Sequence, residues 1–250
     1  MYIDTHCHLE KKYYDNIDDI IKQNRASGID KIIVSGCGID EIREVLGYAE
    51  KYDDVYLTLG FHPEYVEEIK DSDIEWLREI VKNNNKVIGI GEIGLDYYYS
   101  KENKVKQISL FRKLLSLAGE LNLPVVIHSR DATKDTIDIL KEYNLKGIIH
   151  CFSGSLETAK EYIKIGYYLG IGGVVTFKNS NLREELKKLS LHNIVLETDS
   201  PYLSPTPLRG TVNSSKNIPL IAEELANVFN TSLEEVGKVT TENTTSIFNI

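Results

Sequence analysis

Short apolar runs recur along the chain with the length and composition of β-strands. They are rich in isoleucine, valine, leucine and glycine. Several lack the alternation with polar residues that a half-exposed strand shows, which is typical of parallel strands covered on both faces. Eight strands are predicted, over residues 2–5, 31–35, 55–59, 87–91, 125–127, 147–149, 168–171 and 194–196.

Apolar residues after each of these runs recur every three or four positions, which is the spacing of a helix with one buried face. Ile42, Val45 and Ala49 form one such stripe. Ser232 and Glu235 indicate a capping box before a last helix. Eight strands alternating with eight helices predict one α/β domain over residues 1–250, a (β/α)8 barrel of the TIM type. A doubly wound open sheet is the alternative.

The composition is that of an ordinary globular protein, with 42% hydrophobic and 27% charged residues. No membrane span and no secretory signal are predicted, and three cysteines are too few for a disulfide framework, so we expect a cytoplasmic protein. The net charge of −9 argues against a broad basic face that holds nucleic acid. It leaves open an enzyme that grips a phosphodiester through metal ions.

Histidines and carboxylates follow the predicted strands directly, where the active sites of such barrels lie. Five of the six histidines are at these positions, and only His192 is not. A single histidine beside a strand is usually structural, but this grouping predicts a site for a divalent cation at the C-terminal rim. The candidate ligands are His6, His8, Glu92, His128, His150 and Asp199.

Strand alternation places His6 and His8 on one side of the first strand and turns Cys7 away from them. Six ligands exceed one tetrahedral shell, so two ions are expected, and a carboxylate such as Glu92 can bridge them. In that arrangement a bound water becomes the nucleophile, and Asp199 could accept its proton. Glu92 and Asp199 are therefore the candidate catalytic residues.

Other patterns allow competing interpretations. Gly89, Gly91 and Gly94 match GxGxxG, but they follow the fourth predicted strand with no helix directly after, so we interpret them as giving room around Glu92. A glycosidase pair of carboxylates would not need the histidines. Residues 97–99 are consecutive tyrosines that could stack on bases or pack within a loop. The candidate phosphate contacts are Arg130, Arg209 and Lys178, the last being as well explained by a solvated surface role.

Six segments carry a family resemblance along the whole chain: IDTHCH, GFHP, IGEIGLDYYY, PVVIHSRDA, HCFSG and LETDSPYLSP. In this order they resemble the TatD-type metal-dependent deoxyribonucleases of the amidohydrolase-like barrel superfamily. The resemblance implies a (β/α)8 barrel and a divalent-metal hydrolase that cleaves DNA, often as a 3′-to-5′ exonuclease on single strands. DNA would be a substrate rather than a stable partner.

The resemblance also implies a role for each motif residue. His6, His8 and Asp199 would hold the first metal, and Glu92 would bridge to a second. The ligands of that second metal would be His128 and His150. His62, in the GFHP motif, would lie near the substrate phosphate. Mg²⁺ or Mn²⁺ is expected, although such nitrogen and oxygen ligands also accept Zn²⁺.

The chain departs from the family pattern after the eighth predicted strand. Relatives carry a basic stretch resembling PHRGKRNEP, whereas residues 207–215 read PLRGTVNSS. Arg209 remains, but the histidine, the basic pair and the Glu-Pro are absent. The weaker positive charge keeps a hydrolase of small amides, lactones or phosphoesters as a second hypothesis, and a metal-bound scaffold without turnover as a third. No oligomeric state is predicted, and a monomer is compatible with the sequence.

Overall fold

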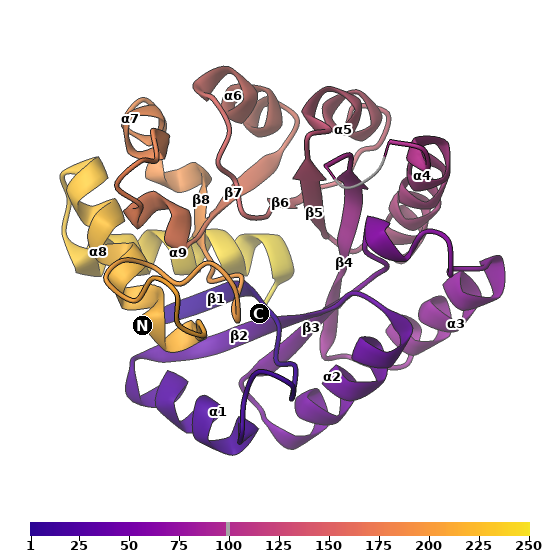
Figure 1. The fold of residues 1–250 in the computed structure, drawn as a ribbon, viewed down its shortest axis with the longest axis horizontal. Helices are drawn as coiled ribbons and strands as arrows, with labels where there is room; N and C mark the ends of the chain where they lie inside the picture. Colours follow the sequence, from indigo (N-terminus) through magenta and orange to yellow (C-terminus); the bar gives the residue numbers. More distant parts are fainter. Residues whose placement is uncertain (99–100) are drawn as a thin grey trace.

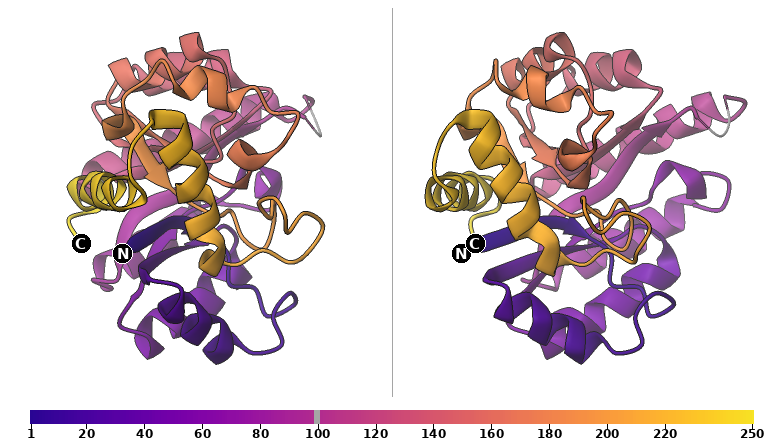
Figure 2. Two further views of the ribbon diagram at one scale, coloured as in Figure 1. Left: turned by 90° about the vertical axis from the view of Figure 1, so that its left-hand side faces the viewer. Right: turned by 60° about the vertical axis from the view of Figure 1, so that its left-hand side comes forward.

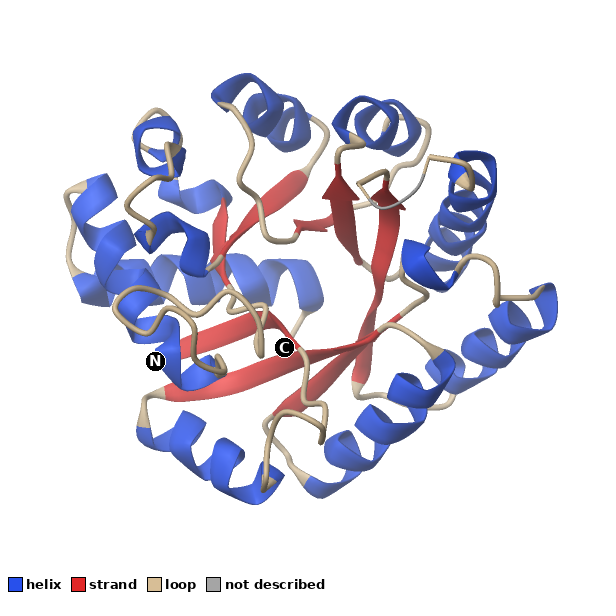
Figure 3. Ribbon diagram, in the orientation of Figure 1, coloured by secondary structure: helices blue, strands red, loops and turns tan. Residues whose placement is uncertain are grey.

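A computed structural model describes residues 1–98 and 101–250 of the chain as a barrel of parallel strands surrounded by helices (Figures 1 and 3). The strands are hydrogen-bonded in sequence order. The predicted barrel is therefore confirmed, and the open doubly wound sheet is wrong. The strands are β1 (Tyr2–Cys7), β2 (Ile29–Gly36), β3 (Val55–Leu59), β4 (Val87–Asp96), β5 (Val125–Arg130), β6 (Gly147–Ile149), β7 (Tyr167–Ile171) and β8 (Ile194–Leu196).

Every predicted helix is present, and the last one is an addition to the regular alternation. Ser232 caps it as predicted, because its hydroxyl accepts a hydrogen bond from the Glu235 amide at 3.1 Å. No helix in the described ranges is long and apolar enough to cross a membrane. The helices are α1 (Ile17–Ala26), α2 (Ile39–Lys51), α3 (Asp71–Lys82), α4 (Lys104–Leu121), α5 (Thr133–Leu140), α6 (Leu156–Lys164), α7 (Leu182–Leu186), α8 (Ile218–Phe229) and α9 (Leu233–Phe248).

The hydrophobic core has two layers. The larger layer lies between the strands and the surrounding helices. The smaller layer fills the barrel interior, and α9 completes it with Ile247 and Phe248. Figure 2 shows α9 at the end of the barrel where the N-terminus lies. Since α9 covers that end, the opposite end, where the strands finish, is the one left for a functional site. The strand residues of the inner layer are Ile3, Ile33, Ile88, Val126, Ile148 and Val195.

Loop and side-chain contacts close the barrel between β1 and β8. Cys7 and Ser200 form an isolated parallel bridge, and the His8 amide donates to the Ser200 carbonyl at 2.6 Å. Asp4 is fully buried and accepts hydrogen bonds from the amide and the hydroxyl of Thr198, at 3.0 and 2.6 Å. These contacts fix the end of β1 beside the segment that follows β8.

Two strands contain an extra residue where they enter the functional end. From Asp4 to Cys7, β1 advances by three residues while the paired segment of β2 advances by two. From Ile90 to Ile93, β4 likewise advances by three residues while β5 advances by two. Such β-bulges change the direction in which the following side chains point. The first bulge brings His6 to the side of the barrel that Ile3 occupies at the closed end. Glu92 lies within the second.

Candidate metal centre

The six predicted ligands meet at the C-terminal end of the barrel. Five of them line a pocket of about 380 Å³, and the sixth, His6, is fully buried beneath it. As alternation predicted, His6 and His8 approach the same carboxylates, whereas Cys7 is buried on the other side with its thiol 3.6 Å from the Ile33 carbonyl. The strands thus bring together residues that are almost 200 positions apart in the sequence.

Glu92 lies at the middle of the cluster, and its two oxygens face different partners. Its Oε2 is 3.4 Å from His6 Nε2 and 3.8 Å from His8 Nε2. Its Oε1 is 2.7 Å from His128 Nδ1 and 2.8 Å from His150 Nε2. One carboxylate therefore connects two groups of nitrogen ligands.

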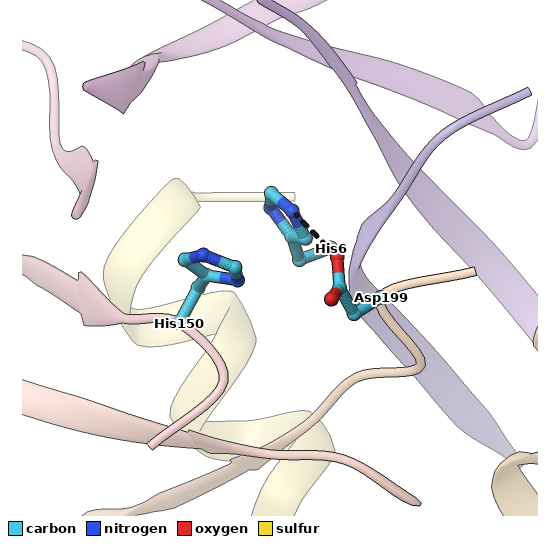
Figure 4. Close-up of side chains that lie close together, drawn as sticks. All are labelled: His6, His150 and Asp199. Carbon is cyan, nitrogen blue, oxygen red and sulfur yellow. Dashed lines mark ion pairs between the residues drawn. The ribbon is translucent and has the colours of Figure 1, made fainter. Parts of the chain in front are cut away.

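The first group, His6, His8, Glu92 and Asp199, has the spacing of a cation shell. Asp199 Oδ1 lies 3.5 Å from His6 Nε2, the pair drawn in Figure 4, and 3.7 Å from His8 Nε2. Four ligands of a tetrahedral ion, each about 2.1 Å from it, are separated from one another by about 3.4 Å. His6 Nε2 is buried and has no hydrogen-bond partner among the described residues. This spacing and this orphaned nitrogen fit a bound cation.

The second group, Glu92, His128 and His150, is more tightly drawn together. Besides their contacts with Glu92, His128 Nδ1 and His150 Nε2 lie 3.2 Å apart. The His150 ring also lies close to that of His6, with 4.2 Å between their centroids (Figure 4). One carboxylate oxygen and two imidazole nitrogens at this separation could hold a cation once the imidazoles are neutral.

The charges in the cluster are set by competition between burial and contact. Burial alone would raise the pKa of Glu92, but contacts with His150, His128 and His6 hold it well below its usual range. Burial opposes a charge on His128, yet hydrogen bonds to Asp96 and Glu92 outweigh that effect and raise its pKa to about 9. Protons on His6 and His128, whose pKa values are both raised, thus stabilise the charged form of these carboxylates.

Ser35 supports His6 from β2, a strand for which the sequence indicated no functional residue. The Ser35 hydroxyl is 3.0 Å from His6 Nδ1 and 2.8 Å from the Thr58 hydroxyl on β3. The contact engages the nitrogen of His6 that points away from the carboxylates, so Nε2 is the atom presented to them. A serine within an apolar strand gives no indication in the sequence that it contacts a candidate ligand.

Asp96 supports His128 in the same way, and sequence reasoning assigned it no role. Its Oδ2 lies 3.1 Å from His128 Nε2. Gln107 of α4 fixes the Asp96 backbone by accepting from its amide and donating to its carbonyl, both at 2.8 Å. The position of Asp96 at a strand end was the only signal that could have found it.

Three of the predicted substrate contacts, His62, Arg130 and Arg209, differ in position. His62 and Arg130 line the pocket. The Glu64 amide donates to His62 Nδ1 at 3.2 Å, so the neutral ring carries its proton on Nε2, 3.8 Å from Glu92 Oε1. Burial lowers the pKa of His62 to about 3. Arg209 instead stacks on Phe177, 3.6 Å from the ring centroid, and is not among the residues that line the pocket.

The tyrosine run separates into residues with different surroundings. Tyr97 is buried, and its hydroxyl donates to Asp135 at 2.9 Å, so it packs within the loop. Tyr98 is 58% exposed and lies under the Arg130 guanidinium, whose central carbon is 3.9 Å from the Tyr98 ring centroid. Tyr99 is outside the described residues.

The glycines near Glu92 serve the contact between strands more than they serve the carboxylate. A Cβ at Gly91 would lie 2.7 Å from Val126 Cβ, and one at Gly94 would lie 1.9 Å from the His128 carbonyl oxygen. Gly94 also has a φ of 151°, which side chains rarely adopt. The predicted room around Glu92 is therefore room for β5 to approach β4, which in turn brings His128 to Glu92.

An acidic rim surrounds the cluster and was not foreseen from the sequence. Glu10, Glu41 and Glu64 line the pocket beside the ligands, together with the thiol of Cys37, which lies 3.6 Å from Glu92 Oε2. Glu41 is held by the Cys37 amide and the Tyr65 hydroxyl. Glu41 lies in the first turn of α2, and the other three residues lie in segments that follow strands, so the apolar pattern of the sequence gives no indication of this rim.

Backbone strain is concentrated at the same end of the barrel. Asp131, Cys151 and Asp199 all have left-handed backbone conformations, with φ of 53°, 49° and 52°. Each is a candidate ligand or directly follows a residue of the pocket. Strained non-glycine residues of this kind cluster at functional sites, where the surrounding contacts hold them in place.

Comparisons with known proteins assign the chain to a family. The model of the family described as TatD related DNase matches residues 3–249. The "uncharacterized metal-dependent hydrolase YabD" of Bacillus subtilis is 38% identical over 255 residues, covering 100% of both proteins. The similarly described YcfH of Escherichia coli is 34% identical, covering 99% of this chain and 96% of YcfH.

Solved structures agree as well. The crystal structure of YjjV, a TatD homologue from Escherichia coli, superimposes with a TM-score of 0.93 and 30% identity, covering 100% of this chain and 98% of YjjV. A TatD family hydrolase from Entamoeba histolytica shares the fold, with a TM-score of 0.90 at 24% identity over 99% of this chain and 97% of that one. This chain is therefore a metal-dependent hydrolase that belongs to the TatD related DNase family.

Proposed function

We propose that the protein cleaves DNA phosphodiester bonds with two divalent ions, Mg²⁺ or Mn²⁺, and that it removes nucleotides from the 3′ end of single strands. The observation that carries the proposal is the position of Glu92. Its two oxygens face two separate ligand groups, as a carboxylate that bridges two ions does. The family to which the chain belongs supports DNA as the substrate.

In this proposal the first ion is held by His6, His8 and Asp199, and the second by His128 and His150, with Glu92 shared. When bound, the ions supply an activated water and neutralise charge on the scissile phosphate. Asp199 accepts the proton of that water, because its carboxylate borders the pocket. His6 and His8 outweigh its burial and keep its pKa below the usual range, so it is ionised and able to accept.

His62 and Arg130 orient the phosphate in this proposal. His62 carries its proton on Nε2, toward the pocket, so it donates a hydrogen bond without adding charge. Arg130 brings a guanidinium, whose planar donors match phosphate oxygens. Tyr98 beneath Arg130 provides an exposed ring for the base next to the scissile bond.

The test is cleavage of single-stranded DNA labelled at its 5′ or 3′ end, with Mg²⁺ or Mn²⁺ and with EDTA as a control. We expect single nucleotides from the 3′ end and loss of cleavage in Glu92→Gln. Glu223→Gln is the matched control, because Glu223 is exposed on α8 and the change is chemically identical. Metal-loaded protein that leaves DNA intact would contradict the proposal.

A second function is favoured by the acidic rim. Glu10, Glu41 and Glu64 repel a polyanion near the pocket mouth, and Arg209 lies against Phe177. Both features suit a small neutral ester, lactone or amide that the same ions would hydrolyse. Turnover of such a compound at a kcat/KM well above that for DNA would establish this alternative.

A further inference from the structure

Glu197 is a fully buried carboxylate that the proposed mechanism does not use. It directly follows β8, and it is not among the residues that line the pocket. Its Oε1 accepts a hydrogen bond from the Cys151 amide, whereas its Oε2 has no partner among the described residues. Buried polar groups nearly always have partners, so an unpaired carboxylate oxygen needs an explanation.

A second unpaired group faces this carboxylate. His150 Nδ1 is buried, has no hydrogen-bond partner in the described part of the chain, and lies 4.0 Å from Glu197 Oε1. The other nitrogen of the same ring, Nε2, is 2.8 Å from Glu92 Oε1. The His150 ring is thus placed between two carboxylates, one in the candidate metal centre and one behind it.

Strand β7 leaves space for the carboxylate at this position. A Cβ at Gly170 would lie 2.0 Å from Glu197 Oε2, and one at Gly172 would lie 3.6 Å from Glu197 Cγ. A larger residue at Gly170 would displace the carboxylate from its place behind His150. The barrel wall therefore accommodates a carboxyl group where an apolar side chain would be the usual choice.

We propose that Glu197 is a positioning residue for His150. It accepts the Nδ1–H of the neutral imidazole, and the Nε2 lone pair is thereby directed at a divalent ion in the second ligand group. The inference rests on the proposed function only in assuming an ion there. A movement of about 1 Å closes the pair to the length of a hydrogen bond. Histidines that bind metals commonly donate their second N–H to a carboxylate in this manner.

The neighbouring ligand shows the same arrangement already formed. His128 faces Glu92 with Nδ1, and its other nitrogen is 3.1 Å from Asp96 Oδ2. Each histidine of the second group thus has a carboxylate on the side away from Glu92. A merely structural role for Glu197, as an acceptor for the Cys151 amide alone, leaves His150 Nδ1 unexplained.

The experiment compares Zn²⁺ binding to metal-free protein by calorimetry in two variants and one control. Glu197→Leu removes the acceptor, and we expect the affinity for the second ion to fall by about 10–100-fold while the first is unchanged. Glu197→Gln keeps the Oε1 acceptor, so its affinity for the second ion should fall by less than about tenfold. Glu223→Gln, exposed on α8, should match the natural protein. Unchanged binding of both ions to Glu197→Leu would overturn the proposal.

A second measurement needs no substitution at Glu197 and decides the matter if Glu197→Leu does not fold. In Zn²⁺-loaded protein with ¹⁵N-labelled histidine, the His150 ring is identified by its absence from the spectrum of His150→Asn. We expect a proton on Nδ1 and an ion on Nε2, and the reverse would exclude the inference. Neither measurement uses DNA, so a protein that binds both ions but cleaves no DNA would contradict the nuclease proposal alone.

Discussion

Cys7 and His8 are adjacent in sequence, and the structure predicts opposite consequences for replacing them. The Cys7 side chain is fully buried away from the ligands, with its thiol 3.6 Å from the Ile33 carbonyl. The His8 side chain is 12% exposed and lies 3.7 Å from Asp199 and 3.8 Å from Glu92. Cys7→Ser should therefore change stability without changing metal binding, and His8→Asn should do the reverse.

The size of each effect follows from these surroundings. Serine at position 7 buries a hydroxyl, but the Ile33 carbonyl can accept its hydrogen bond, so the cost is about 1 kcal/mol. In a protein of this size that is about 2–4 °C in Tm, with or without metal. If His8 is a ligand as proposed, losing its nitrogen should lower Zn²⁺ affinity by about 100-fold or more, which is about 2.7 kcal/mol.

The assay is thermal unfolding in EDTA and in excess Zn²⁺, with metal content measured after dialysis. Binding stabilises the folded protein according to its affinity, so the Tm of Zn²⁺-loaded His8→Asn should be about 5–10 °C below that of the natural protein. In EDTA the two should nearly coincide. Cys7→Ser should be lower by the same amount in both conditions. If Cys7→Ser loses its metal, or His8→Asn keeps full affinity, the orientation of this segment has been misinterpreted.

Three further outcomes can be measured. Gly94→Ala should lower Tm sharply or prevent folding, because its Cβ would lie 1.9 Å from the His128 carbonyl. Gly119→Ala, in the last turn of α4 with nothing within 4 Å of the added Cβ, should instead raise Tm slightly. Metal affinity at the second group should rise up to about tenfold per pH unit between pH 7 and 9, as judged by calorimetry, because His128 with its pKa of about 9 must release a proton to bind. The KM for single-stranded DNA should depend only weakly on salt between 50 and 200 mM, and a steep dependence would indicate a basic binding face that the pocket lacks.

The barrel and the meeting of the candidate ligands at its rim could be predicted because both leave local patterns in the sequence. A strand of three residues, such as β6, is still recognisable as an apolar run between helical stripes. A histidine directly after such a run has its place at the rim fixed by the fold. His128 and His150 are of this kind, and their meeting with Glu92 follows once the strands are parallel and adjacent.

The parts that could not be predicted depend on contacts between distant segments. The alternation rule gave the correct relation between His6 and His8, but nothing in the sequence indicates the bulge between Asp4 and Cys7. The last helix was predicted, but not that its Phe248 would complete the inner core. The role of Ser35 likewise depends on a histidine 29 positions away. A local pattern shows which face of a helix or strand is buried. The bulge, the packing of α9 and the role of Ser35 depend instead on which other segment that face contacts.

The charges of the pocket indicate how an acidic protein would act on a phosphodiester under the proposed function. Six carboxylates and one guanidinium line it among the described residues, a net charge of −5 with neutral histidines. Two divalent ions would bring this to −1, so even the loaded pocket attracts no polyanion over distance. Binding would then come from direct contact between one phosphate and the ions, with Arg130 and His62 at its sides. Such a site favours the end of a strand, because only one phosphate has to enter the acidic rim.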